Sequence, residues 1–172
     1  MTTYLVLTVI GDDKPGLVES LSQAIVDNSG NWLESSMSQL AGKFAGILRV
    51  SVSDRDADQL IDALNGLSGQ LKLVIERVES DEVFKVSQTV ELSLVGNDRP
   101  GIIREISHAL AVMSVNVEQL VTECVPAPMS GDILFKAKSL LKVPADLNLE
   151  VLQSELERLA DDLIVEIELR SL

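Results

Sequence analysis

The stretch Gly11–Gly16, with the sequence GDDKPG, returns as Gly96–Gly101, with the sequence GNDRPG, at an offset of 85 residues (96 − 11). At this offset residues 4–31 and 89–116 share nine identical pairs: Leu7/Leu92, Gly11/Gly96, Asp13/Asp98, Pro15/Pro100, Gly16/Gly101, Ser22/Ser107, Ala24/Ala109, Ser29/Ser114 and Asn31/Asn116. Because the chain has 172 residues, the repeat predicts two copies of one folding module.

Both copies show the same succession of hydrophobic patterns. Val90, Leu92 and Leu94 alternate with polar residues, which predicts a half-buried strand over 89–95 and, by the repeat, over 4–10. The apolar positions after each Pro-Gly fall on one face of a helix, and Pro is favourable at a helix start. Further strands are predicted at 31–40, 44–53, 71–78, 116–125, 133–142 and 163–169, and second helices around Leu60–Leu67 and Leu149–Leu163.

The predicted order is βαββαβ twice, which is the split βαβ arrangement of ferredoxin-like folds. We therefore expect an α+β protein with two modules, each with a four-stranded antiparallel sheet and both helices on one face. The modules should comprise residues 1–80 and 88–172, joined by a short linker at about 81–87 that contains no Pro or Gly.

The composition excludes several functions. Fourteen Lys and Arg against 27 Asp and Glu give a formal charge of −13, which opposes binding to a phosphate backbone or to an anionic membrane. The longest uncharged stretch, 106–117, has 12 residues, whereas a membrane-spanning helix needs about 20. The N-terminus has no basic region before its apolar run, so no signal peptide is expected. These features predict a cytoplasmic protein with no direct nucleic-acid binding.

The two Gly-x-Asp-x-Pro-Gly turns are the strongest candidates for a site. A glycine at the end of a strand allows a positive φ or the close approach of a ligand, and the free N–H groups at the following helix start suit a carboxylate. Asp13 and Asp98 are expected either to cap those N–H groups or to hold an α-amino group. In the alternative interpretation, these residues only shape a tight strand-to-helix turn.

A strand, the motif G-x-D-[KR]-P-G, an apolar helix and Asn at sixteen residues after the Pro resemble the ACT domain, so nearly the whole chain resembles two tandem ACT modules. The stretch Pro126–Gly131 also resembles the two-module glycine cleavage system transcriptional repressors. The resemblance implies regulatory binding of an amino acid between modules, at the turn and at the start of the second strand. The implied ligand-binding residues are Gly11, Asp12, Asp13, Pro15, Gly16, Asn31, Gly96, Asn97, Asp98, Pro100, Gly101 and Asn116, with both Asn side chains expected to face the turn. The amino-acid-binding ACT modules of serine-regulated dehydrogenases resemble this motif but carry Asn where Asp13 and Asp98 stand.

Other polar residues have simpler interpretations. His108, the only histidine, is expected on the surface, and Cys124, the only cysteine, as a small buried hydrophobe. The acidic residues at 54, 56 and 58 precede a predicted helix and favour its N-terminus, while Asp161 and Asp162 are expected in the turn before the last strand. Trp32 is expected to pack on the sheet. No spacing resembles a metal site, and no cofactor is expected.

These observations favour a non-catalytic regulator. The resemblance implies sensing of a small effector, such as glycine, and control of transcription through a DNA-binding partner protein; sheet edges of ACT-like modules also imply a homo-oligomer. The alternative is a structural oligomerisation module without a functional ligand site. An enzyme is disfavoured, because one His and one Cys offer no nucleophile–base pair, and the deformylases that resemble ACT proteins carry a separate catalytic domain.

Overall fold

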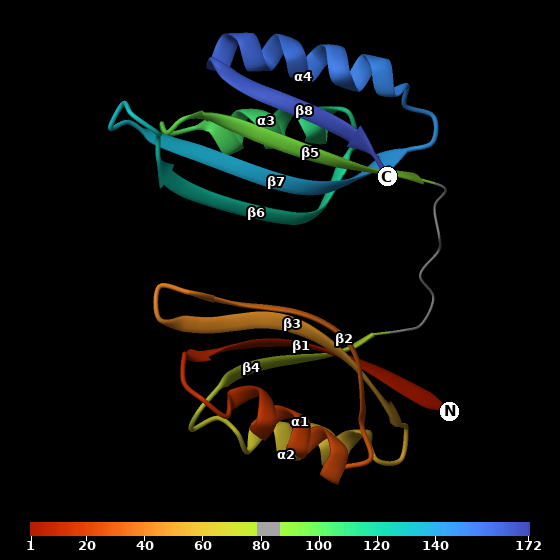
Figure 1. Cartoon of the computed structure of the whole chain (residues 1–172). Helices are drawn as coiled ribbons and strands as arrows, with labels where there is room; N and C mark the ends of the chain where they lie inside the picture. Colours follow the sequence, from red (N-terminus) through yellow and green to blue (C-terminus); the bar gives the residue numbers. More distant parts are fainter. Residues whose placement is uncertain (79–86) are drawn as a thin grey trace. The chain divides into compact units, whose positions relative to one another are not determined.

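The computed structural model describes residues 1–78 and 87–172. The chain divides into two compact units, Met1–Val83 and Phe84–Leu172, called here module 1 and module 2 (Figure 1). The linker predicted at about 81–87 lies outside the described residues except for Ser87, which begins a strand. Its boundaries stay a prediction.

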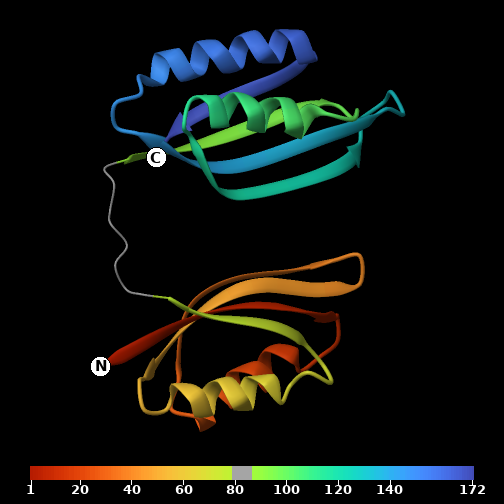
Figure 2. The same ribbon diagram turned by 180° about the vertical axis from the view of Figure 1, so that it is seen from behind.

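Each module is one four-stranded sheet with two helices. Module 1 has sheet order β2-β3-β1-β4 and module 2 has β6-β7-β5-β8, with every pair antiparallel. Figures 1 and 2 show both helices of a module on one face of its sheet. The elements are β1 Thr2–Asp12, α1 Leu17–Asp27, β2 Asn31–Leu40, β3 Lys43–Ser53, α2 Ala57–Asn65, β4 Lys72–Val78, β5 Ser87–Asn97, α3 Ile102–Val112, β6 Asn116–Pro126, β7 Ile133–Pro144, α4 Leu149–Leu163 and β8 Val165–Ser171. The α+β class and the ferredoxin-like topology are confirmed.

The repeated apolar positions form two separate cores. Leu5, Leu7 and Val9 of β1 are completely buried against α1 and α2, because alternate side chains of a strand point to the same face. The equivalent residues of module 2, Val90, Leu92 and Leu94, bury against α3 and α4 in the same way. The opposite sheet face of each module carries the intervening, more polar residues.

Two sequence-based expectations are wrong. Asp161 and Asp162 lie within α4 and not in a turn, because Leu156, Ala160 and Leu163 continue its buried face to the end of the helix. Cys124 is exposed, since β6 is an edge strand that pairs only with β7. Among the described residues no helix has both the length and the apolar character needed to cross a membrane.

Candidate functional site

The two repeated Gly-x-Asp-x-Pro-Gly turns share one geometry. Gly16 and Gly101 immediately precede α1 and α3 with φ angles of 90° and 96°, a left-handed conformation that glycine adopts without strain. Neither helix receives a side-chain cap at this end. A Cβ placed on either glycine would meet no atom within 4 Å. Each turn therefore leaves the first helical N–H groups without a side-chain cap, next to a glycine with open space at its Cβ position.

Asp13 and Asp98 hold their turns in place through the backbone. The N–H of Asp13 donates to the carbonyl of Gly42 at 3.0 Å, and the N–H of Asp98 donates to the carbonyl of Ile133 at 2.8 Å. These bonds tie the turn of module 1 to the loop before β3 and the turn of module 2 to the first residue of β7. The expected capping of the helices by the two carboxylates is absent, so both side chains are left for another role or for solvent.

Gly11 and Gly96 are required by packing within their own modules. A Cβ on Gly11 would lie 2.7 Å from the carbonyl oxygen of Gln70, and one on Gly96 would lie 2.4 Å from Cγ1 of Val165. Neither glycine has a positive φ; that property belongs to Gly16 and Gly101. The close approach predicted at these glycines is therefore made by the chain itself, and a contact with a ligand stays a prediction.

The structure separates Asn31 from the turn of its own module. Asn31 pairs with Ser51, which pairs with Tyr4, seven residues before Gly11 on β1, a distance of about 23 Å along a strand. Asn116 has the same relation to Gly96, through Lys142 and Thr89. Our expectation that the asparagines face the turn of their own module is wrong, because the helix between them returns the chain to the other end of the sheet.

A cleft of about 290 Å³ lies beside Gly11 and Asp12 in module 1, and we call it the basic cleft. It is lined by Ile10, Gly11, Asp12, Lys43 and the segment 68–72. Lys43 forms an ion pair with Asp12, and this hydrogen bond lowers the pKa of the Asp12 carboxyl. Sequence analysis missed Lys43 and the 68–72 segment, because only the sheet register brings them to the end of β1.

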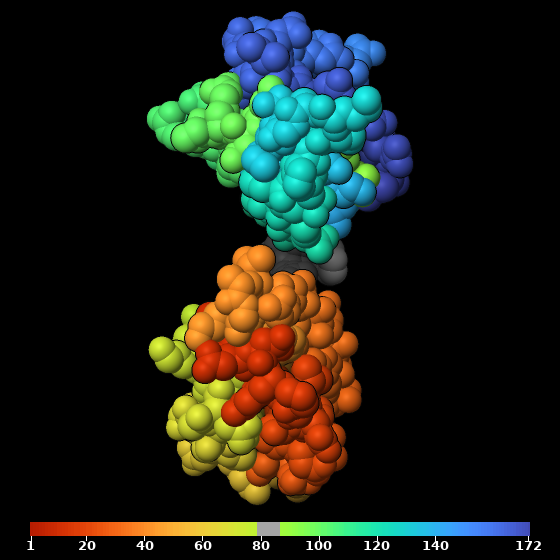
Figure 3. Space-filling view, turned by 60° about the vertical axis from the view of Figure 1, so that its left-hand side comes forward, coloured from red at the N-terminus to blue at the C-terminus, as the bar shows by residue number. Residues whose placement is uncertain are grey.

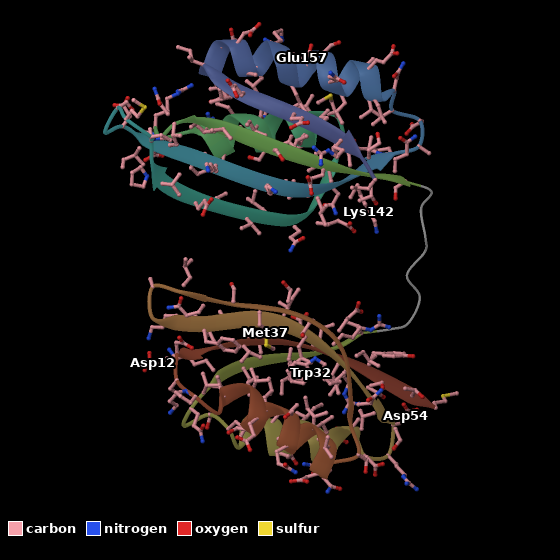
Figure 4. All side chains as sticks on the ribbon, in the orientation of Figure 1. Asp12, Trp32, Met37, Asp54, Lys142 and Glu157 are labelled. Carbon is pink, nitrogen blue, oxygen red and sulfur yellow. The ribbon has the colours of Figure 1, made fainter. Side chains whose placement is uncertain are left out.

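Module 2 contains a smaller and almost wholly apolar cleft, of about 30 Å³, between α3 and β5–β7. Val117 and Leu120 of β6 form one wall, and Ile103 and Ser107 of α3 lie opposite. The residue of module 1 that corresponds to Val117 is Trp32, which packs on the core as predicted (Figure 4). Its indole Nε1 donates to Ser35 Oγ at 3.3 Å.

The acidic cluster before α2 is occupied by structural contacts. Asp54 accepts a hydrogen bond from Thr3 at 2.7 Å, Asp56 accepts one from Ser53 at 2.6 Å, and Asp58 pairs with Arg77. The Ser53 hydroxyl holds the pKa of Asp56 below its usual value. Figure 4 shows Asp54 at the opposite end of the module from Asp12. His108 is exposed, and within residues 1–78 and 87–172 no three His, Cys, Asp or Glu gather as metal ligands would.

Comparison with known families identifies the class of protein. Residues 3–77, nearly all of module 1, match the family model of the ACT domain. Module 2 repeats its element order, its sheet order and its Gly-x-Asp-x-Pro-Gly turn. Module 1 therefore matches the ACT domain over almost its whole length, and module 2 repeats the same fold.

Three similar proteins share more of this chain than module 1 alone. The glycine cleavage system transcriptional repressor of Escherichia coli (strain K12) is 26% identical over 127 residues, which are 72% of this chain and 66% of the repressor, just under two thirds of its length. The crystal structure of an unknown protein from Galdieria sulphuraria is 31% identical, with a TM-score of 0.89 over 100% of this chain and 99% of that one. A proposed glycine cleavage system transcriptional repressor of known structure shares the fold, with 20% identity and a TM-score of 0.72 over 100% of this chain and 98% of that one.

Proposed function

We propose that the protein is a non-catalytic regulator that senses a small metabolite and modulates transcription through a protein partner. The similarity to the Escherichia coli repressor over 72% of the chain carries this proposal. The match of module 1 to the ACT domain supports ligand sensing as the regulatory step. The effector we propose is an amino acid such as glycine.

Of the twelve residues singled out in the sequence, the ten that lie in the two turns are the proposed effector contacts. In support, the N–H groups that follow Gly16 and Gly101 have no side-chain cap, which leaves them free to bind an α-carboxylate. The Asp13 and Asp98 carboxylates, which do not cap their helices, are suited to an α-ammonium group. Asn31 and Asn116 lie too far from the turns of their own modules for one small amino acid to touch both.

Direct DNA binding is not part of the proposal. The chain carries a charge of −13, and none of the four helices has a basic residue in its last turn. The excess of Asp and Glu over Lys and Arg repels the phosphates of DNA and opposes the counterion release on which DNA affinity depends. We expect the purified protein to leave duplex DNA unretarded in a gel at about 0.15 M salt. Retardation by the protein alone would contradict control through a partner.

A thermal-shift screen against the twenty amino acids tests the sensing step. A ligand that binds only the folded state stabilises it by about 2.7 kcal/mol at 100 times its Kd, which raises the melting temperature of a module of this size by about 10–20 °C. Glycine or a related amino acid is the expected hit. Asp13→Asn and Asp98→Asn then remove a charge from each turn while preserving its shape, and should weaken binding about tenfold with little change in melting temperature.

The alternative function is a structural oligomerisation module with no ligand site. Two observations favour this alternative. Gly11 and Gly96 are needed for packing, and the backbone N–H groups of Asp13 and Asp98 anchor the turns. Both are structural roles that would explain the repeated motif without a ligand. A screen without any stabilising amino acid, combined with a concentration-dependent oligomer in ultracentrifugation, would support this alternative over sensing.

A further inference from the structure

The basic cleft of module 1 has a lining that differs in chemistry from the equivalent place in module 2. The turn that both modules share forms only part of this lining. Its walls come from the end of β1, the start of β3 and the segment between α2 and β4. Figure 3 looks onto this end of the module, where the red surface of the first strand and turn lies beside the yellow-green surface that precedes β4. Ile10, which is 42% exposed, supplies an apolar floor.

The uncommitted polar groups of the basic cleft are hydrogen-bond donors. The Asp12 carboxylate is already paired with Lys43. Lys72 forms no ion pair or side-chain hydrogen bond with any residue in the described part of the chain, and the same holds for the side chains of Ser68 and Gln70. In a chain with a net charge of −13, an open cleft with an unpaired ammonium group attracts anions locally where most of the surface repels them.

The corresponding positions of module 2 have the opposite character. Ile10 pairs with Lys72, whereas its counterpart Val95 pairs with Glu166. Asp12 pairs with Lys43, whereas its counterpart Asn97 pairs with Leu134. The fold therefore does not require lysines at this end of the sheet, and their presence in module 1 is specific to this cleft.

We propose that the basic cleft binds a small anion that carries a carboxylate or phosphate group, with an anionic oxygen on the Nζ of Lys72. Lys43, held by Asp12, provides a second ammonium group at the rim, and Ser68 and Gln70 supply neutral donors. A volume of about 290 Å³ suits a metabolite of a few carbon atoms. This inference rests on the proposed function only where it treats the bound anion as the effector that the protein senses.

The test is an NMR titration of the full chain, labelled with nitrogen-15, with inorganic phosphate and separately with succinate, at ionic strength held constant with chloride. We expect saturable shifts of the amides of 10–12 and 68–72. Binding of phosphate alone identifies a phosphate site, binding of succinate alone identifies a carboxylate site, and binding of both identifies a general site for anionic oxygen. Each of these outcomes supports the proposal.

Variants locate the binding. Lys72→Gln should weaken affinity about tenfold or more, because a charge-assisted hydrogen bond is lost, and Lys72→Glu, which copies module 2, should abolish saturation. Glu166→Gln is the matched control in module 2 and should leave the affinity unchanged. Lys72 is exposed, so folding should be preserved, as the dispersion of the spectra will show.

Two results would overturn the inference. One is the absence of saturable shifts with either anion at about 10 mM, well above the Kd expected for even a weak metabolite site. The other is equal affinity in the wild type and in Lys72→Gln. If either result occurs, stabilisation by an amino acid that is lost in Asp13→Asn and Asp98→Asn would still support the proposed function, so the failure of this site and the failure of the proposed function are distinguishable.

Discussion

The two modules share a fold and an apolar core but differ at many of their exposed positions. The buried positions of β1 and β5 are all aliphatic, and both turns keep a left-handed glycine before the helix. On the outward sheet face, by contrast, Ala45 and Ile47 of β3 correspond to Lys136 and Lys138 of β7, since both pairs lie opposite equivalent residues of the central strand. Packing preserves the repeat, and the exposed surfaces have diverged.

Because of this divergence, we expect the two modules to make different contacts with other molecules. Module 1 places a polar cleft with two lysines at the end of its first strand, and module 2 places an apolar cleft beside α3 where Trp32 stands in module 1. The modules therefore place clefts of different chemistry on one scaffold. Replacing residues of one module by their counterparts is the direct way to test this comparison.

The largest expected effect tests whether the two cores are independent. Leu21 of α1 is completely buried in module 1, so Leu21→Ala should lower the free energy of unfolding of that module by about 2–5 kcal/mol. Trp32 is the only tryptophan, so its fluorescence during denaturant unfolding follows module 1 alone. The counterpart Ile106→Ala should move the circular-dichroism transition of module 2 and leave the tryptophan transition in place. Equal movement of the tryptophan transition in both variants would show a single cooperative unit.

A second exchange concerns the middle of the sheet. Gly46 of β3 pairs with Met37, and a Cβ there would fall 2.5 Å from the Met37 side chain and 2.7 Å from its Cα. Its counterpart Ala137 carries that Cβ and is buried. Gly46→Ala should therefore destabilise module 1 by about 1–3 kcal/mol through overpacking, measured by tryptophan fluorescence in denaturant.

The reverse change is the control. Ala137→Gly removes a buried methyl group and should lower the stability of module 2 by about 1 kcal/mol. A neutral Gly46→Ala would mean that β2 moves away from β3 at little cost, so that the difference between the two sheets is only a difference of sequence.

A third exchange concerns the edge strands β2 and β6, at a residue on the sheet face that the helices cover. Trp32→Val gives module 1 the residue that module 2 has at this position, and should lower the stability of module 1 by about 1–2 kcal/mol, less than for a fully buried tryptophan. Val117→Trp should fill the apolar cleft of module 2 and leave its stability unchanged or higher. Circular dichroism follows both variants. Destabilisation of module 2 by Val117→Trp would show that its cleft is too narrow or too rigid for the exchange.

The fold was predictable because it depends on short-range signals that the sequence states twice. Alternating apolar residues and the Pro-Gly turns located nearly all strands and helices within a few residues of their observed bounds. The site was less predictable, because it depends on which residues the register brings together. Asn31 looked close to the turn from the motif, but the register places it at the far end of the sheet. Lys43 and Lys72 belong to no motif, and only their pairing with β1 brings them to the cleft.

The smallest expected effect is a change of titration at the end of β1. The hydrogen bond from Lys43 lowers the pKa of the Asp12 carboxyl below its usual value. A carboxyl whose pKa is lower in the folded state adds stability above its unfolded pKa, and this contribution is lost as the pH falls through the folded pKa. The effect is therefore confined to the acid region, below about pH 4, and leaves stability at neutral pH nearly independent of pH.

Lys43→Gln measures this effect directly. Without the ammonium group, the pKa of Asp12 should rise towards its ordinary value, and an NMR titration of the side-chain carboxyl carbon will show the change. Asn97 is the matched position in module 2, and Asn97→Asp creates a carboxyl opposite Leu134, where no lysine is paired with it. That carboxyl should titrate at a higher pKa than Asp12. Equal pKa values at the two positions would show that the ion pair with Lys43 is too exposed to distinguish the ends of the two modules.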